Sequence, residues 1–447
     1  MNYKASQYNV TTNFKEYVAI HNLISHKGFL LSPKDAVRIL DAIQTPAELN
    51  EGVRKHLTDT GILIDGSINE ADTVRTMRST LIEKKRGRLS LTIIPTYQCN
   101  FKCIYCWENT KQTNDSMSIQ TQRDLLAYIK KRLATCTALD IDWFGGEPLL
   151  AYNVMHDLLE EIACLCRTYR VPYSSTLTTN GYCLTPEIAA YLAEHNNYFF
   201  QITLDGPREL HNFNRPLKSG KGTYDVIFHN LTGIRDSVAN RHIKVFIRIN
   251  VTNDSAGAVE EMIPLIGREF GGDSRFYLYI QAVERHNDLR FADMEGRYLQ
   301  ENSIIERLYD RCIDHGIMTT PLKMLRPGDL MCKTTFYDSV FISSDGSLYK
   351  CDMAMTPDHV SYIGSLQVFD ADELKRRNDS WYKHLREAEY CTDCILYPLC
   401  FGMKCPYYSE INVVDKCEYY NDYVIVKSAV KSYAQQGKYP FLQCGGE

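Results

Sequence analysis

The chain has 447 residues, of which 44% are hydrophobic and 23% are charged, as in an ordinary globular protein. This length allows two or three domains, one of which could be a barrel of about 200–250 residues. The formal charge of −5 gives no net attraction to nucleic acid or to an anionic membrane, and no apolar run is long enough for a membrane span. The N-terminus lacks the basic-then-apolar order of a secretory signal. We therefore expect a cytoplasmic protein whose partners include neither nucleic acid nor membrane.

Residues 1–85 have the pattern of a small separate unit. "QYNVTTNFKEYVAIHNLISHKGFLLS" contains two or three strand-like runs, and "GILIDG" follows later as a short strand. Helices are predicted at "SPKDAVRILDAI" and "TPAELNEGVRKHL", where Ser-Pro and Thr-Pro suit an N-cap and a first helical position. This order predicts a winged-helix-like fold with an exposed edge strand, for which "EYVAIHNLI" is the candidate. The basic stretch "EKKRGR" at 83–88 marks the predicted boundary.

From residue 90 to about 285, predicted strands and helices alternate. The strand candidates are "LSLTIIPT", "LDIDWF", "YSSTLTTN", "YFFQITLD", "IKVFIRINVT" and "RFYLYIQAV". The intervening helices are "SIQTQRDLLAYIKKRLAT", "NVMHDLLEEIACLCRTYR", "TPEIAAYLAEH", "YDVIFHNLTGIRDSV" and "AVEEMIPLIGREF". Six such units predict an α/β fold whose parallel sheet is curled into a complete or partial barrel, with its chemistry at the C-terminal ends of the strands.

Sixteen cysteines are unusual for a protein without an export signal, because clustered thiols in a reducing compartment are more often metal ligands than disulfides. "PTYQCNFKCIYCWENT" places Cys99, Cys103 and Cys106 directly after the first barrel strand. Three thiolates on a short loop can hold three irons of a 4Fe–4S cluster and leave the fourth iron open. A zinc site completed by a distant residue is the alternative.

The spacing C-x3-C-x-aromatic-C, with Tyr105 as the aromatic residue, resembles the signature of the radical S-adenosylmethionine (SAM) enzymes. The resemblance implies that SAM chelates the open iron, and that one-electron cleavage of SAM yields a 5′-deoxyadenosyl radical that abstracts hydrogen from a substrate. "WFGGEPLL" after the second strand resembles the family motif that holds the SAM amino group. "TLTTNG" and "ITLDGP" resemble its polar rim, and "FIRINV" falls where a partner of the SAM carboxylate is expected. The implied SAM-binding residues are Gly145, Gly146, Glu147, Pro148, Thr179, Asn180, Thr203, Asp205, Arg248 and Asn250.

The later cysteines resemble the SPASM extension of radical SAM peptide-modifying enzymes. The resemblance implies one fully ligated auxiliary 4Fe–4S cluster on Cys391, Cys394, Cys400 and Cys417, and a second one on Cys332, Cys351 and Cys405. Four residues separate Cys400 from Cys405, one more than is usual in this family. Either Asp338 completes the second cluster, or one of its irons is open. A pair of zinc ribbons is the alternative for this region. Asp352 matches the position of a proton-accepting aspartate in sulfatase-maturing relatives, so we expect it to be the general base.

The sequence thus predicts a partial (β/α)6 TIM-like barrel, an N-terminal winged-helix-like unit and a Cys-rich C-terminal Fe–S domain. The expected domains are a leader-recognition element at 1–85, a radical SAM barrel at 88–315 and a SPASM domain at 316–447. A DNA-binding winged helix is disfavoured, because "SPKDAVRILDAI" carries as many acidic as basic residues.

The predicted function is maturation of a ribosomally made precursor peptide, which binds through its leader. Three 4Fe–4S clusters, SAM and an electron donor such as flavodoxin or ferredoxin are expected. The product predicted first is a Cys thioether, and a carbon–carbon (cyclophane-type) crosslink comes second. An anaerobic sulfatase maturase that makes formylglycine is the rival enzyme, and an Fe–S electron carrier or zinc scaffold is the non-enzymatic alternative.

Overall fold

The computed structural model describes residues 2–46, 49–106, 116–240, 242–283, 299, 301, 303–319, 325–356, 358–368, 371–383, 387–403 and 422–442. The chain forms two compact units. The N-terminal unit combines residues 1–85, 319–332 and 384–447, and the barrel unit combines residues 86–318 and 333–383. Residues of the expected C-terminal domain, 316–447, thus contribute to both units.

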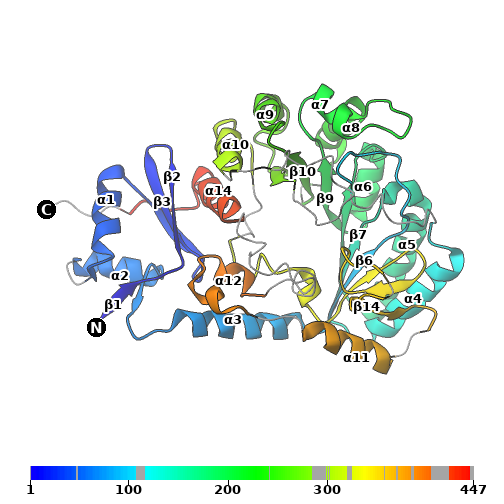
Figure 1. Cartoon of the computed structure of the whole chain (residues 1–447), viewed down its shortest axis with the longest axis horizontal. Helices are drawn as coiled ribbons and strands as arrows, with labels where there is room; N and C mark the ends of the chain where they lie inside the picture. Colours follow the sequence, from blue (N-terminus) through cyan, green and yellow to red (C-terminus); the bar gives the residue numbers. More distant parts are fainter. Residues whose placement is uncertain are drawn as a thin grey trace. The chain divides into compact units, whose positions relative to one another are not determined.

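One sheet forms the centre of the barrel unit (Figure 1). Its order is β11-β10-β9-β8-β7-β6-β12-β13-β14, and the six strands from β6 to β11 are all parallel to their neighbours. β12 lies parallel beside β6, and β13 and β14 continue the sheet in antiparallel register. The strands are β6 Arg88–Ile93, β7 Ala138–Trp143, β8 Tyr173–Thr179, β9 Asn197–Thr203, β10 Lys244–Val251, β11 Phe276–Ala282, β12 Ser339–Ile342, β13 Ser347–Tyr349 and β14 Tyr362–Ser365.

Helices follow the parallel strands and lie along the outside of the sheet (Figure 1). They are α4 Ile119–Leu133, α5 Tyr152–Tyr169, α6 Pro186–Glu194, α7 Arg208–Asn214, α8 Tyr224–Ser237, α9 Ala256–Phe270, α10 Ser303–Asp314 and α11 Ala371–Tyr382, with short 3-10 turns η3 Pro148–Ala151 and η5 Lys333–Thr335. The predicted partial (β/α)6 barrel is confirmed, with each of the six strands at its expected place. Helix α7 was not predicted, because its seven residues are mostly polar and too few to show an apolar period.

The N-terminal unit contains a three-stranded antiparallel sheet, β2-β3-β4, and a separate pair, β1-β5. Its elements are β1 Tyr3–Ala5, β2 Asn9–Phe14, β3 Tyr17–Asn22, β4 Lys27–Leu31, α1 Pro33–Ala42, α2 Glu51–Asp59, β5 Leu63–Asp65, α3 Glu70–Lys85, η6 Glu389–Asp393, α12 Tyr397–Cys400 and α14 Asp422–Gln435. The expectation that "EYVAIHNLI" supplies the edge strand is wrong, because β3 pairs with β2 on one side and with β4 on the other.

One further local prediction needs correction. The Ser-Pro cap is confirmed, since the Ser32 side chain accepts a hydrogen bond from the Asp35 amide at the start of α1. The second helix, however, begins at Glu51, where the Asn50 side chain accepts from the Val53 amide, and not at the Thr-Pro pair. The basic stretch at 83–88 begins inside α3, which ends at Lys85, and it contains the division between the two units.

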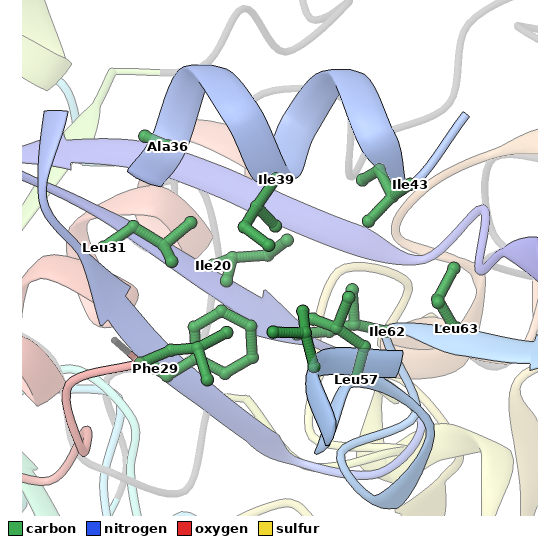
Figure 2. Close-up of a cluster of buried hydrophobic side chains, with 11 residues drawn as sticks. Ile20, Phe29, Leu31, Ala36, Ile39, Ile43, Leu57, Ile62 and Leu63 are labelled. Carbon is green, nitrogen blue, oxygen red and sulfur yellow. The ribbon is translucent and has the colours of Figure 1, made fainter. Parts of the chain in front are cut away.

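Apolar side chains from α1, α2 and the sheet make a compact core in the N-terminal unit (Figure 2). Ile20 of β3 and Phe29 and Leu31 of β4 meet Ile39 of α1 and Leu57 of α2, and all five are almost fully buried. Because successive strand residues point to opposite faces, His21 faces away from this core.

The C-terminal segment completes this unit on the other face of the sheet. Helix α14 contacts β2 and β3, and the Tyr439 hydroxyl is bonded to Nδ1 of the buried His21 at 2.9 Å. The chain then lies along β4, where the Leu30 amide donates to the Pro440 carbonyl and the Leu442 amide donates to the Leu30 carbonyl. The outer edge of β4 is therefore partly paired. β2 is the other end of this sheet, and in the described part of the chain no further strand pairs with it.

Burial of His21 leads to a testable dependence of stability on pH. Desolvation lowers the pKa of His21 to about 3, with a smaller contribution from His26. The unfolded chain, with a pKa near ~6.5, binds this proton first, so stability is present above pH ~6.5 and is lost as the pH falls. We expect His21 to remove about 1.4 kcal/mol of unfolding free energy per pH unit below ~6.5. Native-state hydrogen exchange of β3 amides, corrected for intrinsic rates, would measure this slope. His21→Phe should reduce it, and an equal slope in the variant would contradict the assignment.

Within the described ranges, no helix combines the length and the apolar character that a membrane crossing requires.

Candidate functional site

The three-cysteine loop follows β6, at the C-terminal edge of the parallel strands. A short segment after α7 holds its backbone in place. The Lys102 amide donates to the Pro216 carbonyl, the Ile104 amide donates to the Asn214 carbonyl, and the Lys218 amide donates to the Asn100 carbonyl. The cysteine loop is therefore ordered by a ladder with residues 214–218, more than a hundred positions away in the sequence.

Cys99, Cys103 and Cys106 lie close enough to influence one another's protonation. Burial raises the pKa of the Cys103 thiol to about 12 and also raises the pKa of Cys99, whereas the nearby Arg215 cation opposes the rise. Metal binding to such thiols is coupled to the release of their protons. Within the described residues, no three Cys, His or carboxylate side chains already form a set ready to hold a metal ion. The cluster ligands therefore remain predictions that rest on loop position and donor chemistry.

The GGEP motif follows β7 and lies against the cysteine loop. The Gly146 amide donates to the Thr96 carbonyl, and the Glu147 amide donates to the Gln98 carbonyl. A Cβ at Gly146 would lie 2.4 Å from the carbonyl oxygens of Tyr97 and Gln98, so only glycine allows this close approach. Gly145 has a φ of +125° and is similarly restricted. Pro148 starts the short helix η3. The glycines are thus explained by packing of one loop on another.

The Glu147 side chain has a different place from the one the sequence predicted. It is fully buried and accepts hydrogen bonds from the Thr179 hydroxyl at 2.7 Å, the Asn180 amide at 2.7 Å and the Leu149 amide at 3.1 Å. This carboxylate fastens the end of β7 to the end of β8. The backbone carbonyls of the motif are therefore better candidates for the SAM ammonium group than the Glu147 carboxylate.

Polar residues at the ends of β8, β9 and β10 form a connected rim. The Asn180 side chain donates to Asn100 in the cysteine loop at 2.8 Å. The buried Asp205 carboxylate accepts from the Tyr105 hydroxyl and, at 2.8 Å, from the Asn250 amide. Burial raises the pKa of Asp205, and Arg215 and these hydrogen bonds oppose the rise. Thr203 is buried at the end of β9. The fold therefore brings Asp205 and Asn250 together at the Tyr105 hydroxyl, and Asn180 to Asn100 of the same loop.

Arg248 is less well placed for the SAM carboxylate than the sequence suggested. Its Nε donates to Asn250 Oδ1 at 2.9 Å, and its guanidinium group lies 5.7 Å from the centre of the Tyr279 ring. These contacts aim it along its own strand and toward β11.

Arg215 is a site residue that the sequence analysis did not select. It is almost fully buried, its Nη1 donates to the Tyr105 hydroxyl at 2.9 Å, and its charge acts on Cys103. Its buried Nε finds no hydrogen-bond partner among the described residues. An unpaired guanidinium donor beside the cluster loop fits an anionic ligand, and the SAM carboxylate has this chemistry. The sequence feature that could have pointed to Arg215 is the arginine of "NFNRP", ten residues after the aspartate of "ITLDGP".

The auxiliary cysteines are divided between the two units. Cys332, Cys391, Cys394 and Cys400 belong to the N-terminal unit and Cys351 to the barrel unit. Cys405 and Cys417 lie outside the described residues. Cys351, Cys391 and Cys400 are buried, and Cys332 and Cys394 are partly exposed. Both auxiliary cluster assignments remain proposals.

Asp338 does not have the surroundings of a cluster ligand. One of its carboxylate oxygens pairs with Arg132 at 2.5 Å, and the other accepts from the Gly87 amide at 3.2 Å, just before β6 begins. The start of β6 is the end of the barrel opposite the cysteine loop. Both carboxylate oxygens of Asp338 are therefore engaged away from the cysteines, which disfavours Asp338 as a cluster ligand. Asp352 is partly buried beside Cys351, and its Oδ1 accepts from the Met353 amide.

Comparison with known proteins relates this chain to one enzyme superfamily. Residues 93–266 match the family model of the Radical SAM superfamily. The cysteine-type anaerobic sulfatase-maturating enzyme of Clostridium perfringens (strain 13 / Type A) is 25% identical over 341 residues, which cover 70% of this chain and 88% of that protein. Radical SAM cyclopropyl synthase TigE of Paramaledivibacter caminithermalis is 26% identical over 256 residues, 51% of this chain and 53% of its own. The structure of native anSMEcpe with bound AdoMet and Kp18Cys peptide superposes with a TM-score of 0.56 at 20% identity, covering 78% of this chain and 97% of the other, so the two share a fold.

The matched range contains the cysteine loop, the GGEP motif and the rim residues of β8 to β10, so residues 93–266 form a radical SAM domain. This domain implies one 4Fe–4S cluster and SAM as cofactors. Within the superfamily, the chain's similarity extends to sulfatase-maturating enzymes and to a cyclopropyl synthase.

Proposed function

We propose that this enzyme matures a ribosomally made precursor peptide and installs a crosslink, in the first place a Cys thioether. The observation that carries this proposal is the free edge of β2 in the N-terminal unit. A strand edge without a partner is a ready template for an extended peptide, which gains main-chain hydrogen bonds along it. The exposed Thr11 and Asn13 alternate with the buried Val10, Thr12 and Phe14. The edge of β2 would bind the peptide through its backbone. The exposed positions of β2 would then select among peptides by contacting their side chains.

The residues of the barrel would divide the work at the reaction centre. Cys99, Cys103 and Cys106 would hold the cluster, and Arg215 would bind the SAM carboxylate. Carbonyl groups of the GGEP motif would meet the SAM ammonium, and Asp205, Thr203 and Asn250 would line the nucleoside pocket. When bound, the cluster and SAM supply a 5′-deoxyadenosyl radical that removes a hydrogen atom from the substrate.

Two auxiliary 4Fe–4S clusters complete the proposal. Cys391, Cys394, Cys400 and Cys417 would ligate one cluster fully. Cys332, Cys351 and Cys405 would hold the other with one iron open, since Asp338 is engaged by Arg132. An open iron suits a cysteine thiolate of the substrate. Asp352 would then be the general base beside Cys351, and a flavodoxin or ferredoxin would supply electrons.

Formylglycine formation on a sulfatase is the second candidate. The relatives named as cysteine-type anaerobic sulfatase-maturating enzymes favour it, because they align with 70% of this chain. Two features weigh against formylglycine formation. Position 338 holds an aspartate instead of a cluster-ligating cysteine, and the chain carries the N-terminal unit. A carbon–carbon crosslink is the alternative within peptide maturation.

Mass spectrometry separates these candidates. The reconstituted enzyme would be incubated under anaerobic conditions with SAM, a reductant, and either a Cys-containing sulfatase peptide or the peptide encoded beside its gene. Crosslinking removes two hydrogens from the peptide, whereas formylglycine formation replaces a thiol by an aldehyde. We expect the two-hydrogen loss, with alkylation of the product showing one fewer free thiol. An aldehyde on the sulfatase peptide would refute the proposal, and a two-hydrogen loss with every thiol still free would favour the carbon–carbon link.

A further inference from the structure

Three hydrogen bonds attach the cysteine segment 391–402 to the first 85 residues of the chain, within the N-terminal unit. The Thr392 carbonyl, directly after Cys391, accepts from the Tyr8 hydroxyl at 2.8 Å and from Gln7 Nε2 at 2.9 Å. At the other end of the segment, the Phe401 carbonyl, directly after Cys400, accepts from Arg78 Nη1 at 3.1 Å. A carboxylate four residues before Cys391 is also tied down, because Glu387 pairs with Arg78 at 2.7 Å.

The Glu387 pair is part of a small charge network on α3. Arg75 and Arg78 are three residues apart and share one helix face, and Arg75 Nη2 lies 2.9 Å from the other Glu387 oxygen. The hydrogen bonds of both arginines lower the pKa of Glu387, although burial opposes this effect. The carboxylate is therefore ionised and accepts two charged donors, an arrangement stronger than neutral hydrogen bonds.

Packing restricts the same segment. Tyr8 is fully buried, with its ring centre 6.3 Å from that of Tyr397 in α12. Gly402 has a φ of +64°, and a Cβ there would come within 3.0 Å of Glu387 and 3.2 Å of the Cys391 Cβ. The backbone on both sides of the buried Cys391 and Cys400 is thus set by contacts with strands and helices that lie outside the radical SAM domain.

We propose that residues 1–85 position the ligands of the auxiliary cluster on Cys391, Cys394 and Cys400, with Tyr8 and Arg78 as the positioning residues. This inference rests on the auxiliary cluster of the proposed function. It assigns residues 1–85 a role beyond peptide recognition. Tyr8 directly precedes β2, so the contact with Thr392 also joins the free strand edge to the cluster ligands.

The test compares metal content in the full-length, anaerobically reconstituted protein. Wild type should bind about twelve irons in three 4Fe–4S clusters. Arg78→Gln should retain about eight, because it removes the charge that holds Glu387 and the donor to Phe401, and Arg78→Lys should restore most of the loss. Tyr8→Phe removes a single hydrogen bond, and we expect iron release from one cluster to a ferrous chelator to become about tenfold faster. Arg38→Gln and Tyr17→Phe are the matched controls in the same unit and should behave as wild type.

Electron paramagnetic resonance identifies the affected cluster. The signal that changes on addition of SAM, and 5′-deoxyadenosine formation with dithionite, should be unaltered in Arg78→Gln, while one SAM-insensitive signal disappears or shifts. If Arg78→Gln and Tyr8→Phe keep all the iron, the same signals and the same release rate as a twelve-iron wild type, the positioning role is refuted and the proposed function is not. A wild type with about four irons would refute the auxiliary assignment of the proposed function together with this inference.

Discussion

Replacing Cys99, Cys103 and Cys106 together by Ala should abolish SAM cleavage and lower bound iron from about twelve to about eight per chain. The three thiols are the predicted cluster ligands on the loop after β6, and without that cluster SAM would not be reduced and cleaved. The measurements are iron and sulfide content after anaerobic reconstitution, and 5′-deoxyadenosine formed from SAM and dithionite.

A matched variant separates loss of ligands from loss of fold. Cys164→Ala and Cys183→Ala remove two thiols of the same domain that have no predicted cluster role, and they should keep full iron and SAM cleavage. Survival of SAM cleavage in the triple variant would mean that the reaction centre is elsewhere. A bound zinc ion in place of iron at this loop in the oxygen-free wild type would overturn the assignment as well.

Arg215→Gln should weaken SAM binding about 10- to 100-fold, the effect of losing a charge-assisted hydrogen bond worth about 1.5–3 kcal/mol. The reason is the buried Nε, which has no hydrogen-bond partner among the described residues, in a side chain that contacts Tyr105 of the predicted cluster loop. Arg215→Lys keeps the charge but not the fork of donors, so its loss should be smaller. Calorimetric titration of SAM into the reconstituted protein measures these affinities.

Two other arginines provide the comparison for Arg215. Arg248→Gln should weaken SAM binding less, because Arg248 already donates to Asn250. Arg208→Gln disrupts an exposed pair with Asp225 and a contact with the Tyr224 ring, and it should leave the affinity unchanged. Removing Arg215 also removes a positive charge that stabilises the buried Asp205 carboxylate, and this loss could destabilise the fold. Iron content and thermal unfolding must therefore be measured in parallel. A normal affinity for SAM in folded Arg215→Gln, or a larger loss in Arg248→Gln, would show that another residue binds the SAM carboxylate.

The fold of the barrel unit could be predicted because strand-like and helix-like patterns alternate along its sequence. Buried residues recur at alternate positions in strands such as β7 and β8, and the helices between the strands have an amphipathic period. Local chemistry also located the Ser32 cap of α1. The second cap was misplaced because Thr45-Pro46 and Asn50 are both acceptable starts, and the choice between them depends on how α2 packs.

The edge of the N-terminal sheet could not be identified from local pattern. The sequence of β3 predicts a strand, but no local pattern shows whether that strand lies at the edge or in the middle of a sheet. Its central place follows only from pairing with both β2 and β4. The C-terminal residues that pair with Leu30 come from more than 400 positions later. Tertiary packing selects such distant pairing partners, and local sequence patterns do not predict them.

The sequence by itself determined the donor set: three thiols at a fixed spacing, a Gly-Gly turn and polar strand ends. These features depend on residue type and spacing, which are local properties. Tertiary structure decided the partners of each charged group, since a carboxylate or guanidinium is satisfied by whatever the fold brings within about 3 Å. For this reason Glu147 joins two strands and Asp338 pairs with Arg132. Arg215, which no sequence motif marked, lies buried beside the cysteine loop, and its Nε has no hydrogen-bond partner among the described residues.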